Sequence, residues 1–279
     1  MLACLGDLVE DVVVRLDGPV NVASDTRAHI SRRRGGSAAN VAASAAALGH
    51  RARFLGQVGV DAIGTVLLAG LGDDGVDTSM VRRRGATGTV VALVDSHGER
   101  TMLTDRRACL DLDDPDPSWL DGVDTLHVPF YSLVGGLVAA TATTVIGWAH
   151  ERGVVVSIDL SSTAIILEVG VDEVLRRLAA AAPSVVFANG DEAAALAIEG
   201  PVVGAISVVK RGARPAVVHR TDGSFVDVDA IAVPGVSDTT GAGDAFAAGF
   251  LTSPGWRDEP KRACESGHRA AAELLRGRC

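Results

Sequence analysis

The chain has 279 residues, of which 47% are hydrophobic and 22% are charged, so it can bury a sizeable core and is not expected to be disordered. A formal net charge of −9 argues against general binding of nucleic acids or anionic membranes, although small phosphorylated ligands need only a local positive potential. Four cysteines without CxxC spacing predict neither a zinc site nor a disulfide framework and suit a reducing cytoplasm. The early acidic residues and the lack of a long apolar run predict a cytoplasmic protein without a signal peptide or membrane span.

Short β-rich segments dominate the first hundred residues. They are Leu2–Leu5, Val12–Leu16, Ala28–Arg32, Arg53–Val58, Thr87–Asp95 and Arg100–Thr104. The last two flank the turn SerHisGlyGlu and are expected to form a hairpin. The regions at about 12–33 and 87–104 alternate apolar and polar residues, as a half-exposed antiparallel sheet does. We therefore expect a small β-sheet lid that projects from the body, either as a flap over a pocket or as the surface of a homodimer.

From about residue 120, apolar strands alternate with helical segments. The strands are expected at Thr125–Val128, Val154–Ile158, Val185–Ala188 and Ile206–Val209, and the helices at Leu133–His150, Val171–Ala181 and Asp191–Ile198. Strands that are apolar on both faces and alternate with helices indicate a parallel sheet covered on each side. The sequence therefore predicts an α/β fold, with residues 1–279 in a single domain.

A glycine-rich loop, AspThrThrGlyAlaGlyAsp at 238–244, leads into an apolar segment that is expected to be helical. It is neither a Walker A loop, which needs a lysine, nor a GxGxxG dinucleotide fingerprint. Gly241, Ala242 and Gly243 are expected at the helix N-terminus, where free N–H groups and the helix dipole bind anions. Asp244 is either a base that accepts a proton from a hydroxyl attacking phosphorus, or a first-turn acid that stabilises the helix.

A second glycine-containing segment, GlyGlySerAlaAlaAsnVal at 35–41, opens an alanine-rich helix. Its paired glycines allow close approach to the backbone, and Asn40 can both donate and accept hydrogen bonds. Taken alone, this segment is either part of a binding site or an ordinary glycine-containing helix start.

Five motifs, in their order and spacing, resemble those of the ribokinase-like sugar kinases, also called the phosphofructokinase B family. They are GlyAspLeuValGluAsp (6–11), GlyGlySerAlaAlaAsn (35–40), AsnGlyAspGlu (189–192), LysArgGly (210–212) and AspThrThrGlyAlaGlyAsp (238–244). The resemblance covers nearly the whole chain, and the last motif is highly specific. It implies a ribokinase-like three-layer sandwich, with a mostly parallel central sheet and a small projecting β lid.

The resemblance implies an ATP-dependent carbohydrate kinase that phosphorylates a primary hydroxyl of a small sugar or sugar derivative. By this resemblance, Asp244 is the base, and the N–H groups of 241–243 form the anion hole for the moving phosphoryl group. Asp11, Gly36 and Asn40 match positions that hold sugar hydroxyls.

The resemblance also implies a nucleotide site with magnesium. Asn189 and Glu192 match a pair that organises Mg²⁺ and the ATP phosphates, with Glu192 as the metal-side carboxylate. Lys210 and Gly212 lie where the family contacts ATP. His268 matches the segment beside the adenine, although an ordinary amphipathic helix explains its surroundings equally well.

Several departures from the family pattern put ribose itself in doubt. Val9 replaces a polar residue before the sugar-binding aspartate, 128–131 is apolar where ribokinases have a carboxylate, and 106–110 reads ArgArgAlaCysLeu instead of ArgGlyAlaAsn. Each change removes a hydrogen-bond partner for a substrate hydroxyl. Phe130 and Tyr131 either favour a nucleoside or belong to the core.

The monovalent-cation site of the family looks incomplete, because the chain stops soon after the adenine-side helix. Asp238 and Thr240 are its remaining candidate ligands, so dependence on K⁺ is left open. Pro215 stands where a glycine is usual near the nucleotide, and the local loop must differ because proline fixes φ. This keeps a catalytically silent sugar- or nucleotide-binding regulator as an alternative to a sugar or nucleoside kinase.

Two further features have local interpretations. The basic run Arg32–Arg34 is interpreted as ordinary solvated surface. Asp159 follows a buried strand, at the carboxyl end where ligand-binding residues gather, and is either such a residue or part of the fold.

Overall fold

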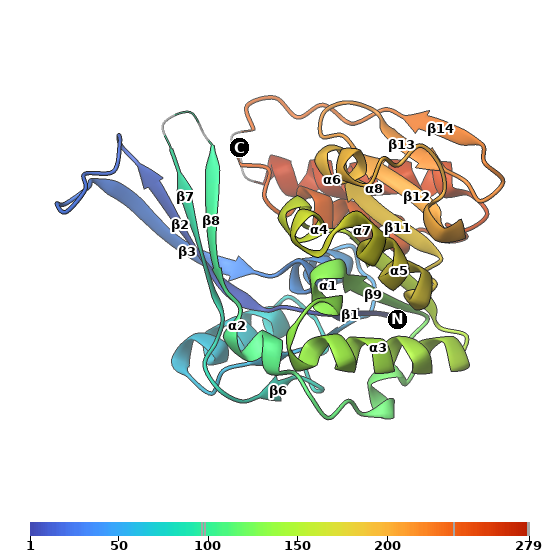
Figure 1. The fold of residues 1–279 in the computed structure, drawn as a ribbon, viewed down its shortest axis with the longest axis horizontal. Helices are drawn as coiled ribbons and strands as arrows, with labels where there is room; N and C mark the ends of the chain where they lie inside the picture. The colour runs from blue at the N-terminus through green and yellow to red at the C-terminus, as the bar shows by residue number, and fades with distance from the viewer. Residues whose placement is uncertain (96, 98, 237, 278–279) are drawn as a thin grey trace.

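A computed structural model of the chain describes residues 1–95, 97, 99–236 and 238–277. The described residues form an eight-stranded sheet between two helical layers and a four-stranded sheet that projects from the body (Figure 1). We call the four-stranded sheet the lid. The predicted α/β sandwich with a small projecting sheet is confirmed.

The eight-stranded sheet is parallel except at one edge. Its order is β14-β13-β12-β11-β10-β9-β1-β4; neighbours from β4 to β12 pair in parallel, whereas β12, β13 and β14 pair antiparallel. The strands are β1 (Leu2–Leu5), β4 (Ala52–Leu55), β9 (Thr125–Pro129), β10 (Val155–Asp159), β11 (Val185–Asn189), β12 (Ile206–Lys210), β13 (Ala216–His219) and β14 (Phe225–Val228).

Alternate side chains of these strands point to opposite helical layers, which gives the sheet a core on each face. Ala3 and Leu126 pack in a cluster with α3 (Gly136–Glu151), α4 (Thr163–Val169), α5 (Val171–Ala181) and α6 (Gly190–Ala195). Cys4 and Phe187 pack in a cluster with α1 (Ser37–Ala47), α2 (Ala62–Asp73), α7 (Ala242–Leu251) and α8 (Pro260–Arg276). The helices thereby cover the sheet on both sides, as the apolar strands predict.

The lid strands are ordered β3-β2-β7-β8. They are β2 (Val9–Leu16), β3 (Ala28–Gly35), β7 (Thr89–Val94) and β8 (Arg100–Asp105). β2 pairs antiparallel with β3 and parallel with β7, and β7 pairs antiparallel with β8. The predicted hairpin is therefore confirmed, although its SerHisGlyGlu turn lies partly outside the described residues.

Smaller elements connect the layers, and several predicted elements differ at their ends. The connecting elements are β5 (Gln57–Val58), β6 (Arg82–Arg83), and the 3-10 helices η1 (Arg107–Asp111), η2 (Pro117–Leu120), η3 (Phe130–Leu133) and η4 (Val202–Gly204). The strand predicted at 53–58 is divided into β4 and β5, which pair with β1 and β6 respectively. The helix predicted from Leu133 begins at Gly136, because η3 directly follows β9.

Candidate active site

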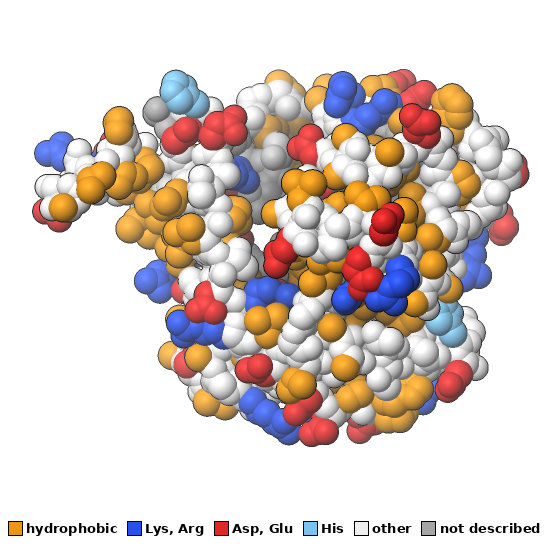
Figure 2. All heavy atoms as spheres, viewed as in Figure 1, with side chains coloured by type: hydrophobic (Ala, Val, Ile, Leu, Met, Phe, Trp, Pro, Cys, Tyr) orange, Lys and Arg blue, Asp and Glu red, His pale blue; other side chains and the backbone are white. Residues whose placement is uncertain are grey.

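A cavity of about 680 Å³ lies between the lid and the carboxyl ends of the parallel strands. Figure 2 shows a hollow between the lid and the body. Most of the predicted site residues line this cavity: Asp11, Gly36, Asn189, Glu192, Lys210, Gly212, Gly241, Ala242, Gly243 and Asp244. They meet there, although they are far apart in the sequence, because parallel strands end at one edge of their sheet.

Asp244 lies in the first turn of α7, against the start of α1. Its carboxylate accepts hydrogen bonds from the Ser37 hydroxyl at 2.7 Å and from the Asn40 side-chain amide at 2.9 Å. Burial raises the pKa of Asp244, and these two hydrogen bonds act in the opposite direction. The two glycine-containing segments therefore form one unit. Sequence reasoning missed Ser37, whose only signal is its place directly after the paired glycines.

Gly36 allows the close contact that builds this unit. It precedes α1 with a φ of 99°, and a Cβ there would lie 2.1 Å from the carbonyl oxygen of Asp7. An L side chain is disfavoured by the positive φ and excluded by the contact. The segment after β1 is thereby held against the start of α1, where Ser37 and Asn40 orient Asp244.

The N-terminus of α7 faces the same cavity, with Gly241 at the N-cap in a left-handed conformation. The N–H of Ala242 donates to the Thr239 carbonyl at 3.1 Å, because the chain closes a tight turn before the helix. An anion hole that uses this N–H requires that bond to open. A Cβ on Gly243 would lie 3.3 Å from the Lys210 Nζ, so the ammonium group is beside the predicted anion site.

Asn189 and Glu192 are held together by a capping box at the start of α6. The Asn189 side-chain oxygen accepts from the Glu192 N–H at 2.9 Å, and the Glu192 carboxylate accepts from the backbone N–H and the side-chain amide of Asn189, both at 2.8 Å. The capping box thus gives the Asn and the Glu of the motif AsnGlyAspGlu a structural role at the start of α6. It fixes the Glu192 carboxylate at the cavity wall.

Lys210, at the end of β12, joins Asp159 and Glu192 in a buried charge cluster. Its ammonium group is ion-paired with Asp159. Burial acts to lower the pKa of Lys210, but the charges of Asp159 and Glu192 raise it. Burial and the charge of Asp159 raise the pKa of Glu192 to about 7. Asp159 therefore belongs to the site as a cavity-lining partner of Lys210.

The carboxylates of the cavity suit Mg²⁺ only if a bound substrate supplies further oxygen ligands. No three His, Cys, Asp or Glu side chains form a metal-binding group within the part of the chain that the structure describes. Mg²⁺ keeps several waters and is usually held by one or two carboxylates plus substrate phosphates. Glu192 and Asp159, which both line the cavity, match that requirement.

At the lid side of the cavity, Arg106 holds Asp7 and Tyr131 in place. Its guanidinium donates to both oxygens of Asp7, at 2.7 and 2.9 Å, and to the Tyr131 carbonyl at 3.2 Å. It also stacks over the Tyr131 ring, 4.8 Å from the centroid. Phe130 is fully buried core, whereas Tyr131 lines the cavity, and its buried hydroxyl has no hydrogen-bond partner among the described residues.

The interpretation of Arg32–Arg34 as ordinary surface is wrong for Arg33. Period-two alternation along β3 turns Arg33 to the inner face of the lid, where it is paired with Asp11 in register. Its guanidinium donates to Asp238 at 2.6 Å and to the Thr240 hydroxyl at 3.0 Å. Arg100 of β8 donates to Asp238 as well, at 2.8 Å. Burial acts to raise the pKa of Asp238, but the hydrogen bonds from Thr240, Arg33 and Arg100 hold it far below its usual range.

His268 is not part of the cavity lining. Its ring is buried between α8, β14 and α7, with Nε2 3.1 Å from the Val228 carbonyl oxygen and an edge contact to Phe246. Burial lowers the pKa of His268. The structure thus places His268 in the core, as expected if its segment is an ordinary amphipathic helix.

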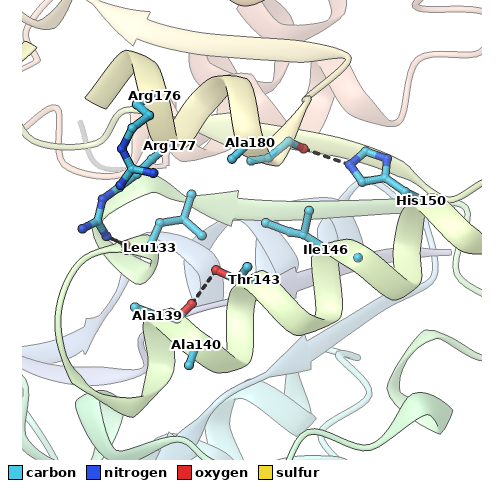
Figure 3. A pocket seen from close by; sticks show the side chains of 11 residues that line it. Leu133, Ala139, Ala140, Thr143, Ile146, His150, Arg176, Arg177 and Ala180 are labelled. Atoms are coloured by element: carbon cyan, nitrogen blue, oxygen red, sulfur yellow. Dashed lines mark hydrogen bonds between the residues drawn. The ribbon is translucent and has the colours of Figure 1, made fainter. Parts of the chain in front are cut away.

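A second hollow, of about 670 Å³, lies between α3 and α5, away from all predicted site residues (Figure 3). Ile146 and Ala140 belong to its largely apolar wall, and Arg176 and Arg177 at its rim both donate to Glu173. Its titratable groups therefore already have partners, and we find no constellation for catalysis there.

Comparison with known proteins identifies the family of the chain. The model of the pfkB family of carbohydrate kinases matches residues 1–277. The chain belongs to this family. An ATP-dependent ribose-1-phosphate kinase from Halopiger xanaduensis is 36% identical over 96% of this chain and 89% of its own length. A fructokinase from Klebsiella pneumoniae is 30% identical over 84% of this chain and 81% of its own length. Adenosine kinase from Sinorhizobium meliloti, a solved structure, has 25% identity and a TM-score of 0.85 over 98% of this chain and 93% of its own.

The predicted carbohydrate-kinase class and ribokinase-like fold are therefore confirmed. No helix among residues 1–95, 97, 99–236 and 238–277 has the length and apolar character needed to cross a membrane.

Proposed function

We propose that this carbohydrate kinase transfers the γ-phosphoryl group of ATP to a primary hydroxyl of a small sugar or sugar derivative, with Asp244 as the base. The observation that supports it is the place of the Asp244 carboxylate. It lies at the start of α7, shares one cavity with Asp11 on the lid side and Lys210 on the strand side, and is oriented by Ser37 and Asn40.

In this mechanism the sugar hydroxyl lies against Asp244, which accepts its proton as the oxygen attacks phosphorus. The new O–P bond forms while the bond between the γ-phosphorus and the β–γ bridging oxygen breaks, and ADP leaves with the electron pair. The helix N-terminus at 241–243 and the Lys210 ammonium stabilise the negative charge of the transferring group. Asp11, Gly36 and Asn40 hold the sugar.

Glu192 and Asn189 belong to the nucleotide side in this proposal, with Glu192 as the residue that holds Mg²⁺, partly through water. Mg²⁺, when bound, neutralises charge on the β- and γ-phosphates. Gly212 lines the cavity near Lys210 and leaves space for the nucleotide. The position of His268 in the core does not favour a direct adenine contact.

The substrate class has two candidates within this chemistry. The ribose-1-phosphate kinase and fructokinase relatives favour a sugar. The Tyr131 ring in the cavity wall and the adenosine kinase fold favour a nucleoside as the alternative. A silent regulator remains the alternative from another class, and it predicts binding without ADP formation.

The deciding experiment is ADP release from MgATP with pentoses, hexoses, sugar phosphates, sugar acids and nucleosides. Asp244→Asn is compared with Asp191→Asn, which removes an exposed first-turn acid from α6. Loss of about 10²–10⁴-fold in kcat for the first variant alone supports the base. Equal, small effects in both would support the helix-stabilising interpretation of Asp244. Thermal stabilisation by ligands without ADP formation would support the regulator.

The lid is also our proposed homodimer surface. Ile30 and Leu103 point away from its inner face and are 65% and 53% exposed. Sedimentation of the wild type and of an Ile30→Glu, Leu103→Glu variant tests this. A wild-type monomer would refute it.

A further inference from the structure

The strand register of the lid places its inner side chains in three rows. Residues paired across neighbouring strands point to the same face, and successive rows are about 7 Å apart. From the body outward, the rows contain Asp11 with Arg33, Val90 and Thr104, then Val13 with Ser31, Ala92 and Met102, then Arg15 with His29, Val94 and Arg100. Two rows that carry guanidinium groups therefore flank a mainly apolar row.

These rows border a small cavity of about 50 Å³. Since roughly 15 Å³ suffices for one water molecule, there is room for a group of several heavy atoms. The charged side chains in its lining are Arg15, Arg33, Arg100, Asp11 and Asp238, so the local formal charge is +1 in a protein with a net charge of −9. A local positive potential of this kind attracts an anion.

Two of the guanidinium groups have donors to spare. Arg15 is exposed, and among the described residues its guanidinium has no hydrogen-bond or ion-pair partner. The buried Nε of Arg33 has no hydrogen-bond partner, and its nearest carboxylate oxygen, on Asp11, is 3.8 Å away. By contrast, Arg106 already donates to Asp7 and to the Tyr131 carbonyl.

The small cavity adjoins the active-site cavity, because Asp11, Met102 and Thr240 line both. A sugar held between Asp244 and Asp11 therefore has its far end directed toward the lid. This argument rests on the proposed function, since it assumes that the reacting hydroxyl lies at Asp244.

We propose that the sugar substrate carries an anionic group, a phosphate monoester or a carboxylate, at the end opposite the reacting hydroxyl. This group binds under the lid against Arg15 and the Nε of Arg33. Guanidinium groups match both kinds of anion through paired N–H donors. The lid then selects among sugars by charge, in addition to covering the cavity.

The test compares D-ribose, D-ribose 1-phosphate and 2-keto-3-deoxygluconate as acceptors, with ADP release as the assay. The variant Arg15→Met keeps an unbranched, largely apolar stem but removes the guanidinium group and its charge. Its matched control is Arg32→Met. Arg32 lies on the outer face of the lid, where it is exposed and forms an ion pair with Glu10. Charge-assisted contacts predict that Arg15→Met lowers kcat/KM for the anionic sugar roughly 10- to 100-fold, mainly through KM, without changing KM for ATP. Arg15→Lys should recover part of the loss.

The outcomes separate this inference from the proposed function. Preference of the wild type for ribose 1-phosphate identifies a phosphate, and preference for the sugar acid identifies a carboxylate. Turnover of uncharged sugars alone, or an unchanged preference in Arg15→Met, overturns the inference while the kinase activity stands. If no sugar yields ADP, the proposed function fails, and calorimetry with ribose 1-phosphate decides the subsite. Weaker binding to Arg15→Met than to the wild type then supports it, whereas equal affinity or no binding to the wild type overturns it.

Discussion

Glu192→Gln should make the protein more stable at pH 8 and have little effect near pH 5. The Glu192 side chain is only 2% exposed, and burial together with the charge of Asp159 raises its pKa from 4.5 to about 7. A folded-state pKa above the unfolded value means that the folded protein binds the proton more tightly. Ionisation of Glu192 therefore lowers the free energy of unfolding as the pH rises from about 4.5 to 7. The full shift corresponds to about 3 kcal/mol.

Glutamine removes the charge and keeps the shape, but it has one acceptor oxygen for the two hydrogen bonds from Asn189. Losing one of them costs about 1 kcal/mol. We therefore expect the variant to be about 2 kcal/mol more stable than the wild type at pH 8, with a difference near zero at pH 5. Urea unfolding at pH 5, 6, 7 and 8 measures this difference directly.

The matched control is Glu199→Gln, which removes an exposed carboxylate close by in the chain. It should change the stability by less than about 0.5 kcal/mol at every pH. A difference between Glu192→Gln and the wild type that stays constant from pH 5 to 8 would refute the reasoning, because the Glu192 carboxyl would then not titrate in this range. A variant less stable than the wild type at pH 8 would mean that the capping box outweighs the burial of the charge.

Three further results are expected. Because burial raises the pKa of Asp244, the loss of kcat/KM on acidification should begin at a higher pH than the pKa of an ordinary aspartate would give. A profile of kcat/KM that is flat down to pH 4.5 would contradict this. Gly36→Ala should lower the thermal midpoint strongly because its Cβ would meet a carbonyl oxygen at 2.1 Å, whereas Gly147→Ala in α3, with open space around it, should be neutral or stabilising in the same thermal scan. Arg106→Met leaves the Asp7 carboxylate buried without its partner and should cost about 3–5 kcal/mol in urea unfolding, and a loss below 1 kcal/mol would show that Asp7 is solvated.

The body of the fold was predictable because its signals are local. Buried parallel strands are apolar along their length, and the amphipathic pattern of α5 predicts its observed bounds, Val171–Ala181. Strand and helix ends were less predictable, since the 3-10 turn at Phe130–Leu133 depends on how the chain leaves β9. The lid was also predictable from the mixture of apolar and polar residues at 12–33 and 87–104, although β8 is exposed along its whole length and not on one face alone.

Contacts between distant segments explain what the sequence could not predict. Arg33 looks like its neighbours in a basic run, and only the pairing of β3 with β2 and the approach of the loop at 238–240 separate its environment from theirs. Ser37 acquires its role from α7, about two hundred residues away. His268 lies in a segment that resembles the adenine side of the family, but the packing of α8 on α7 buries its ring. Sequence periodicity carries no information about such pairs.

The carboxylates of the cavity also explain why bound ligands should stabilise the protein in a pH-dependent way. The pKa values of Asp11, Asp244 and Glu192 are all raised, first by burial and then by the charges of neighbouring aspartates. At neutral pH the cavity therefore carries a repulsion between carboxylates that Lys210 and Arg33 partly offset. In the proposed mechanism, ligand hydroxyls that donate to Asp11 and Asp244, and a cation at Glu192, would relieve it. Stabilisation by a bound sugar and MgATP should therefore be greater at pH 8 than at pH 5.5, which follows from the same linkage that governs Glu192.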